Sequence, residues 1–228
     1  TLTDNICAVY RAGMPGANVS NNTVTMGRWD VDMSENLDEF YWNGAHRAIF
    51  TTGSSGLQIM DNTLGRTAGT TTLLEGIVVG YTQEGNEVVF RNSATDLDIA
   101  YVGEGVCADV ENDPSLLGLQ FQCNTNTNNA TNFKSRIAAG SSEQEHGRQT
   151  IRGRQGTPTI GASNSFGGAQ HFEVGTRCDA LEYVEYSYGS GQAPATYTVQ
   201  DLGDLDADYL EPVLVSSTIT CPTGTPVY

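Results

Sequence analysis

The chain has 228 residues, a formal net charge of −16 and 38% hydrophobic residues. This length suits one large all-β domain, which we predict to span residues 1–228. The acidic balance excludes nucleic acid as a partner, because phosphate binding draws on clustered Lys and Arg. Apolar runs such as Gly76–Tyr81 are strand-sized and far shorter than the roughly 18 residues of a membrane-spanning helix.

The sequence favours strands from one end to the other. Short runs of β-branched and aromatic residues recur between Gly, Asn, Asp and Ser, and we find no helical periodicity. Residues 1–20, before the first run, are a candidate extended N-terminal arm. The predicted strands, in chain order, are Thr23–Val31, Glu39–Phe50, Gly56–Met60, Thr70–Tyr81, Glu87–Arg91, Asp98–Val102, Leu116–Cys123, Phe133–Ala138, His171–Gly175, Leu181–Tyr188, Ala195–Val199 and Tyr209–Thr220.

The turns between these strands predict a β-sandwich or jelly roll. Glu84–Asn86 and Ser190–Gly191 are tight-turn sequences that suit hairpins and Greek-key connections. Thr70–Tyr81 is apolar almost throughout, so it is expected in the middle of a sheet, where Gly76 and Gly80 mark a bulge or close packing.

Two polar stretches are predicted to be long loops of this domain. Asn124–Asn132 is almost pure Asn and Thr, with too few apolar residues to bury much surface. Gly140–Gly156 is polar and Gly-rich, and its Ser141–His146 section could hold one helical turn. We find no interdomain linker and no internal repeat, which favours a single domain.

Five cysteines occur without any Cys-x-x-Cys pair, so disulfides are expected rather than a zinc or redox motif. If disulfides close local loops, Cys107 pairs with Cys123 and Cys178 with Cys221, although the sequence alone allows 15 arrangements with one thiol left over. Cys7 would then be either a small buried apolar residue or a crosslink to a neighbouring subunit.

Disulfides indicate an exported protein, located outside the cell or on a cell or virion surface. Three glycosylation sequons point the same way. The first residue, Thr1, suggests that an export signal or anchor was removed or is not included in this sequence. The candidate glycosylation sites are Asn18, Asn21 and Asn129.

A calcium loop is the best-supported cofactor site. Carboxylates at alternate positions can wrap oxygen atoms around a hard cation, whereas a solvated acidic loop would look the same. The pattern is not an EF-hand, because Tyr209 stands where the sharp-turn Gly should be. The candidate calcium ligands are Asp201, Asp204, Asp206 and Asp208, and Asp30 with Asp32 and Asp96 with Asp98 repeat the Asp-x-Asp spacing.

Catalytic patterns are weak. His46 and His171 could converge only if their strands are adjacent, and Glu182 and Glu185 point to opposite faces of a strand. Arg148, Arg152 and Arg154 form a basic island that could dock on an acidic patch of another copy or balance charge locally. No catalytic residue is assigned.

Two functions remain open from the sequence. The first is a non-enzymatic structural subunit of an extracellular assembly, such as a pilus-like filament, capsid or surface layer, joined to other copies of itself by β-strand addition. The alternative is a secreted carbohydrate-binding protein or glycosidase with a cleft of carboxylates and tyrosines.

Overall fold

The structure is a computed structural model of the chain. It describes residues 2–3, 7–27, 45–82, 86–105, 118–136, 151–152, 154–157, 161–175, 184–189, 197–199, 210–215 and 221.

The described residues form strands in four sheets. Sheet A consists, in spatial order, of β1 (Leu2–Thr3), β4 (Thr23–Met26), β7 (Thr63–Arg66), β10 (Ser93–Thr95) and β13 (Thr125–Thr127). Sheet B consists of β2 (Cys7–Ala12), β5 (His46–Thr52), β8 (Leu74–Gly80), β11 (Ile99–Glu104), β14 (Asn129–Arg136), β16 (Gly168–Gly175) and β18 (Tyr197–Val199). Sheet C consists of β3 (Asn18–Ser20), β6 (Gln58–Met60), β9 (Val88–Phe90) and β12 (Gln120–Gln122), and sheet D of β15 (Arg154–Gln155), β17 (Val184–Gly189) and β19 (Leu210–Val215).

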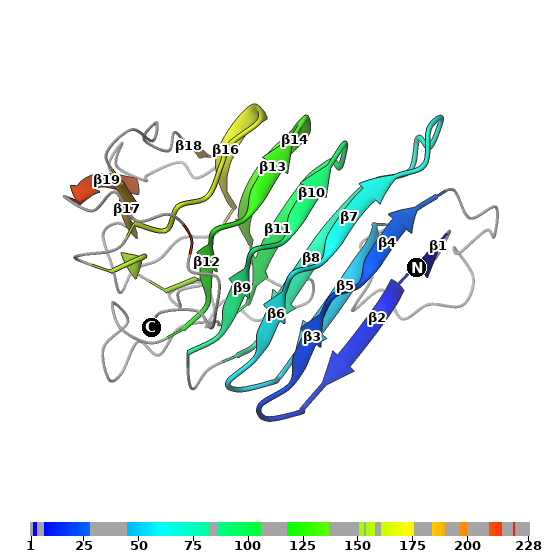
Figure 1. Ribbon diagram of the computed structural model, residues 1–228, viewed down its shortest axis with the longest axis horizontal. Coiled ribbons are helices and arrows are strands. Elements are labelled where there is room, and N and C mark those ends of the chain that lie inside the picture. The colour runs from blue at the N-terminus through cyan, green and yellow to red at the C-terminus, as the bar shows by residue number, and fades with distance from the viewer. Residues whose placement is uncertain are drawn as a thin grey trace.

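The chain winds as a parallel β-helix. One coil takes a strand of sheet B, then one of sheet C, then one of sheet A, and the next coil repeats this order, so that β5 lies beside β2 and β6 beside β3. All these pairings are parallel. Figure 1 shows the coils side by side, from the blue N-terminal coil to the green and yellow ones. Each coil therefore touches mainly its neighbours, as in other solenoids.

The all-β prediction is confirmed, and the sandwich or jelly roll is not. Each predicted strand overlaps an observed strand, but the paired strands of the described residues run parallel, whereas those folds are built from antiparallel sheets. Alternating apolar residues indicate that a segment is a strand without indicating the direction of its partner. The strands that flank the two predicted turn sequences do not pair as hairpins, because β8 and β9 lie in different sheets, as do β17 and β18. Glu84, Ser190 and Gly191 themselves lie outside the described residues.

The core lies inside the coils, where side chains of successive strands stack in register. Tyr101, Phe133 and Phe172 occupy matching positions of β11, β14 and β16, with ring centroids 5.2 Å and 4.9 Å apart. The position of β8 inside sheet B confirms that Thr70–Tyr81 is central. Gly76 packs so closely on the Ala100 carbonyl that a Cβ there would overlap it, as expected for close packing.

The exposed loop predicted at Asn124–Asn132 is wrong. These residues form β13 and the start of β14, and Asn124, Asn126, Asn129 and Asn132 are buried. Polar side chains can be buried when their hydrogen bonds are made inside the protein, and here the asparagines bond to one another and to backbone carbonyls.

The first 20 residues take part in the sheets. Their described part supplies β1, β2 and β3. Strands β2 and β3 belong to the first coil, and β1 pairs with β4 of that coil. In the second polar stretch, Arg154–Gln155 forms β15, while Ser141–His146 lies outside the described residues. Among the described residues, no helix has the length and apolar character needed to cross a membrane.

Candidate functional site

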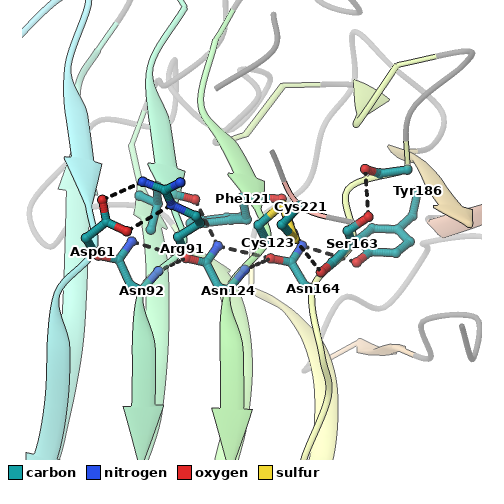
Figure 2. The surroundings of a disulfide bond; sticks show 12 residues. Asp61, Arg91, Asn92, Phe121, Cys123, Asn124, Ser163, Asn164, Tyr186 and Cys221 are labelled. Carbon is teal, nitrogen blue, oxygen red and sulfur yellow. Dashed lines mark hydrogen bonds and ion pairs between the residues drawn. A yellow bond between two sulfur atoms is a disulfide. The ribbon is translucent and has the colours of Figure 1, made fainter. Parts of the chain in front are cut away.

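One asparagine per coil stacks at the corner between sheets C and A (Figure 2). From the second asparagine of the row onwards, the Oδ1 atom accepts the backbone N–H and the Nδ2–H of the asparagine one coil earlier, at distances between 2.9 and 3.1 Å. We call this row the asparagine ladder. Its members are Asn22, Asn62, Asn92, Asn124 and Asn164.

From Asn62 onwards, the second hydrogen of the ladder amide also ties neighbouring coils together. The Nδ2 of Asn92 donates to the Ile59 carbonyl at 2.9 Å, and that of Asn124 donates to the Val89 carbonyl at 2.8 Å. Because each amide binds a side chain and a backbone in adjacent coils, the ladder fixes the stacking register of the coils.

A left-handed residue precedes each ladder asparagine. Asn21, Asp61, Arg91, Cys123 and Ser163 have φ between 52° and 60°. This conformation turns the chain sharply from sheet C into sheet A, and Asn or Asp tolerates it better than β-branched residues do. The Arg91 guanidinium also binds Asp61, with Nη2 2.7 Å from Oδ2.

The last coil of the ladder is closed by a tyrosine. The Tyr186 hydroxyl of β17 accepts the Nδ2–H of Asn164 at 3.1 Å, where the Oδ1 of a further asparagine would otherwise stand. Burial raises the pKa of Tyr186, against a smaller lowering from hydrogen bonds of Asn164, so the hydroxyl is neutral at physiological pH. Figure 2 shows the Tyr186 ring beside Asn164 at this end of the row.

A disulfide lies at the same corner. Cys123, the left-handed residue before Asn124, is bonded to Cys221 with 5.6 Å between the Cα atoms and 98 residues between them in sequence. The local pairing predicted from the sequence, Cys107 with Cys123 and Cys178 with Cys221, is therefore wrong. The coil brings distant segments together, so closeness in sequence does not predict closeness in space. Cys107 and Cys178 lie outside the described residues.

The first coil of the ladder is open. Asn22 donates its Nδ2–H to Asn62 and to the Ser20 carbonyl, but within the described part of the chain its Oδ1 accepts no hydrogen bond. Asn22 is also half-buried, whereas Asn62 and Asn92 are each 1% exposed. Among the described residues, this acceptor therefore lacks the donors that the Oδ1 atoms of the later coils have.

Strand β2 presents a second open feature, because it is an edge of sheet B among the described strands. The Gly13 N–H donates to the Thr52 carbonyl at 2.9 Å, which directs the amide of Gly13 towards β5. Since backbone amides alternate along a strand, those of Tyr10 and Ala12 point away from β5. Both residues are exposed.

The outer face of sheet B carries a buried charge network instead of a catalytic pair. Arg47 Nε lies 3.1 Å from Glu75 Oε2 and its Nη2 lies 3.3 Å from Glu104 Oε2. Arg136 binds the same two carboxylates, with Nη2 2.6 Å from Glu104 Oε2. Two positive and two negative charges thus compensate one another at side chains that are at most 13% exposed.

The network keeps Glu75 ionised. Burial alone would raise the pKa of Glu75, but hydrogen bonds and the charge of Arg136, followed by those of Arg47, outweigh it and lower the pKa. A glycosidase acid needs the opposite shift, because it must carry a proton at its working pH. Glu75 does not have the properties of a general acid.

Glu87 is a buried carboxyl group with the opposite shift. Its Oε1 accepts the Gly56 N–H at 3.1 Å, and its Oε2 is buried without a hydrogen bond in the described structure. Burial raises the pKa of Glu87 to about 7, against smaller lowering from the Gly56 and Glu87 backbone amides. This group therefore takes up a proton near neutral pH.

The thiol of Cys7 is not positioned for reaction. It packs beside the cluster of Phe50, Val78, Ile99 and Val102, and it is not in a disulfide. Burial raises its pKa to about 11, so the reactive thiolate is scarce at neutral pH. These observations favour a packing role for Cys7 over a crosslink.

The described part of the chain holds no cluster of three or more His, Cys, Asp or Glu that could bind a metal ion. The four candidate calcium ligands Asp201, Asp204, Asp206 and Asp208 lie outside the described residues, as do Asp30 and Asp32. Asp98 is described and is bound by Arg66 and the Leu74 N–H.

The structure places the candidate histidines far apart and the three candidate glycosylation sites in different environments. Strands β5 and β16, which hold His46 and His171, are separated in sheet B by β8, β11 and β14, so the two histidines do not converge. Asn18 and Asn21 are exposed, whereas Asn129 is 1% exposed with its Nδ2 bonded to the Ala94 carbonyl, which leaves no room for a glycan.

Glu182 lies outside the described part of the chain, as does Arg148 of the basic island. Tyr186 is buried and closes the ladder, so it is not a surface on which a sugar could stack.

Comparison with known proteins gives no relative. The chain matches no protein-family model, no curated protein and no solved structure.

A sequence pattern marks the ladder asparagines, and the search for motifs did not detect it. Each ladder asparagine is followed by Thr or Ser, as in Asn62-Thr63 and Asn92-Ser93, and an apolar residue stands three positions before most of them. The repeat has no fixed period, because ladder neighbours are 40, 30, 32 and 40 residues apart.

Proposed function

We propose that the protein is a non-enzymatic structural subunit of an extracellular assembly, joined to a neighbouring copy by β-strand addition at its first coil. The contrast between the two ends of the asparagine ladder carries this proposal. Tyr186 occupies the acceptor position beyond Asn164, whereas the Oδ1 of Asn22 receives no donor from the described residues. An open sheet edge is a template for pairing with another chain.

The edge of β2 supplies the backbone part of this docking surface. A strand laid against β2 would receive hydrogen bonds from the outward-facing amides of Tyr10 and Ala12, and a side-chain amide next to Asn22 would continue the ladder. Main-chain pairing gives affinity and the ladder contact gives register. The same two elements hold the coils together within the subunit.

An extracellular location agrees with the Cys123–Cys221 disulfide, because such bonds persist in oxidising compartments. The 27 acidic residues give the subunit surface a charge that keeps copies apart except where specific bonds form.

The carbohydrate-active alternative has less support. Its chemistry requires a carboxyl group with a raised pKa facing a second carboxylate across a cleft. On sheet B, Glu75 and Glu104 are both bound by arginines. Glu87 is fully buried, and its Oε1 accepts a hydrogen bond from the Gly56 backbone. None of these groups meets the requirement.

The test is the native mass of the purified chain across a range of concentrations, by light scattering and negative-stain microscopy. We expect oligomers or polymers for the wild type. Ala12→Pro removes an amide that the subunit itself does not use, so it should shift the mass to the 24.4 kDa monomer. Ala12→Ser is the matched control and should assemble like the wild type.

A 24.4 kDa monomer at every concentration would contradict the proposal. Assembly that survives Ala12→Pro would place the interface elsewhere. Repeating the measurement with calcium and with a chelator tests whether the loop of Asp201, Asp204, Asp206 and Asp208 contributes a cation site, which remains a proposal.

A further inference from the structure

The outer face of sheet A carries two rows of hydroxyl side chains in strict register. Along each strand the buried residue lies between an outward-facing pair, as Val24 does between Thr23 and Thr25. Strand pairing aligns these outward residues across the sheet. The first row is Thr23, Thr63, Ser93 and Thr125, and the second is Thr25, Gly65, Thr95 and Thr127.

These side chains are accessible and their hydroxyls are not used inside the protein. Thr23, Thr63, Thr125 and Thr127 are exposed, and the other members of the rows are partly exposed. In the part of the chain that the structure describes, none of their hydroxyls makes a hydrogen bond. Hydroxyls that have no hydrogen-bond partner inside the protein are available to bond to water or to a ligand at the surface.

The rows form a regular two-dimensional lattice. Neighbouring strands of a sheet are about 4.8 Å apart, and residues two apart along a strand are about 6.7 Å apart. Figure 1 shows β4, β7, β10 and β13 running side by side in one direction, which repeats the lattice over four coils. The ligand of such a surface is expected to be periodic as well.

The composition of the face narrows the class of ligand. The rows hold no aromatic side chain, and flat sugar-binding surfaces rely on aromatic rings for stacking. They also hold no charged side chain, although the chain has 27 acidic and 11 basic residues, so a mineral or polyion is not favoured. The chemical groups that the rows do present are hydroxyls and methyl groups, and both kinds of group order the water next to them.

We propose that the outer face of sheet A binds crystalline ice. Water oxygens in ice repeat at intervals of a few ångströms, the same order as the hydroxyl lattice, so several hydroxyls can bond to one crystal plane at once. The methyl groups restrict the orientation of the water between them. The face would then hold water in an ice-like arrangement that merges with the crystal.

Many weak hydroxyl contacts to one ice plane can together give tight binding. One hydroxyl bond contributes little by itself, but the contacts of a rigid array add because they form together. Threonine is branched at Cβ and rigid at χ1, and its backbone is fixed in a strand, so little side-chain entropy is lost when the crystal is bound.

The experiment is partition of the purified chain into slowly grown polycrystalline ice, together with microscopy of ice growth below the melting point. We expect the wild type to enter the ice and to slow its growth. Thr63→Tyr with Thr125→Tyr breaks the plane of the first row and should abolish both effects. Thr71→Tyr is the matched control, because Thr71 is exposed outside the rows, and it should behave like the wild type. Circular dichroism verifies the fold of each variant.

A gain of function sharpens the test. Gly65 is the gap in the second row, and a Cβ there would meet only the Thr95 carbonyl, at 3.9 Å, which is ordinary contact. Gly65→Thr completes the row and should strengthen the slowing of ice growth, whereas Gly65→Ala should not.

Exclusion of the wild type from ice would overturn the proposal, as would equal partition of the wild type and the Thr63→Tyr/Thr125→Tyr variant. Binding to crystalline cellulose or chitin without binding to ice would also overturn it. Because Ala12→Pro lies outside the rows, ice partition of that variant separates this proposal from the assembly proposal.

Discussion

The two ends of the coil stack complete their hydrogen bonds differently. At the last coil of the ladder, a tyrosine hydroxyl receives the amide of Asn164 and a disulfide fastens Cys221 to the neighbouring corner. At the first coil, the Asn22 Oδ1 and the outer edge of β2 have no partner among the described residues. A repetitive fold has no intrinsic stopping point, so the closure of an end has to be encoded by residues that depart from the repeat.

The largest expected effect lies at the closed end. Cys221→Ser releases a loop of 98 residues, and chain-entropy arguments give about 4.7 kcal/mol for a loop of that size. Urea unfolding followed by circular dichroism measures the change. An unfolding free energy within about 0.5 kcal/mol of the wild type would show that the disulfide does not fasten this end.

The middle of the stack, rather than either end, should set the pH dependence of stability. Because the pKa of Glu87 is about 7 when folded and 4.5 ordinarily, the folded protein holds this proton more tightly than the unfolded chain. The unfolding free energy therefore falls as pH rises from about 4.5 to 7, by about 3 kcal/mol in all. Urea unfolding at a series of pH values measures this slope, and Glu87→Gln should flatten it. An unchanged slope in that variant would assign the dependence to other groups.

Removing only the closing hydroxyl is a milder way to open the last coil. Tyr186→Phe keeps the ring and leaves one N–H of the buried Asn164 amide without an acceptor, while the other still binds the Phe121 carbonyl. The unpaired N–H costs about 2 kcal/mol. Differential scanning calorimetry of the two proteins gives the difference. A variant as stable as the wild type would mean that the ladder does not need closing at this end.

The smallest effect is expected at the open end. Asn22→Ala removes side-chain bonds of a half-buried amide and should cost about 1 kcal/mol or less, whereas Asn92→Ala leaves Asn62 donors without an acceptor and should cost about 3 kcal/mol. Paired denaturation curves decide this comparison. Equal costs would show that the first coil is closed like the others.

The strands were predictable from the sequence, and their arrangement was not. Runs such as Thr70–Tyr81 carry their strand signal locally, in β-branched and apolar side chains. Parallel pairing depends on which distant segments lie together, and the varying loop lengths between coils hide the repeat. The same limitation affected Cys123, whose partner is 98 residues away.

The ladder could have been found from its chemistry rather than its period. Asn124–Asn132 looks like a solvated loop when only apolar content is counted, although its asparagines bond to one another inside the coil. A recurring Asn followed by Ser or Thr, directly after a short apolar run, is the signal that joins Asn62, Asn92 and Asn124. The charge network was harder to predict from the sequence, because its four members come from four separate strands.

The open first coil is tested most directly by amide hydrogen exchange of β2 at increasing protein concentration, with β11 as the internal reference. The docking account predicts that the amides of Tyr10 and Ala12, which point away from β5, exchange quickly in dilute solution and become protected as copies assemble. Exchange in β11, which is paired on both sides, should not change. Exchange at Tyr10 and Ala12 that is independent of concentration would contradict the account.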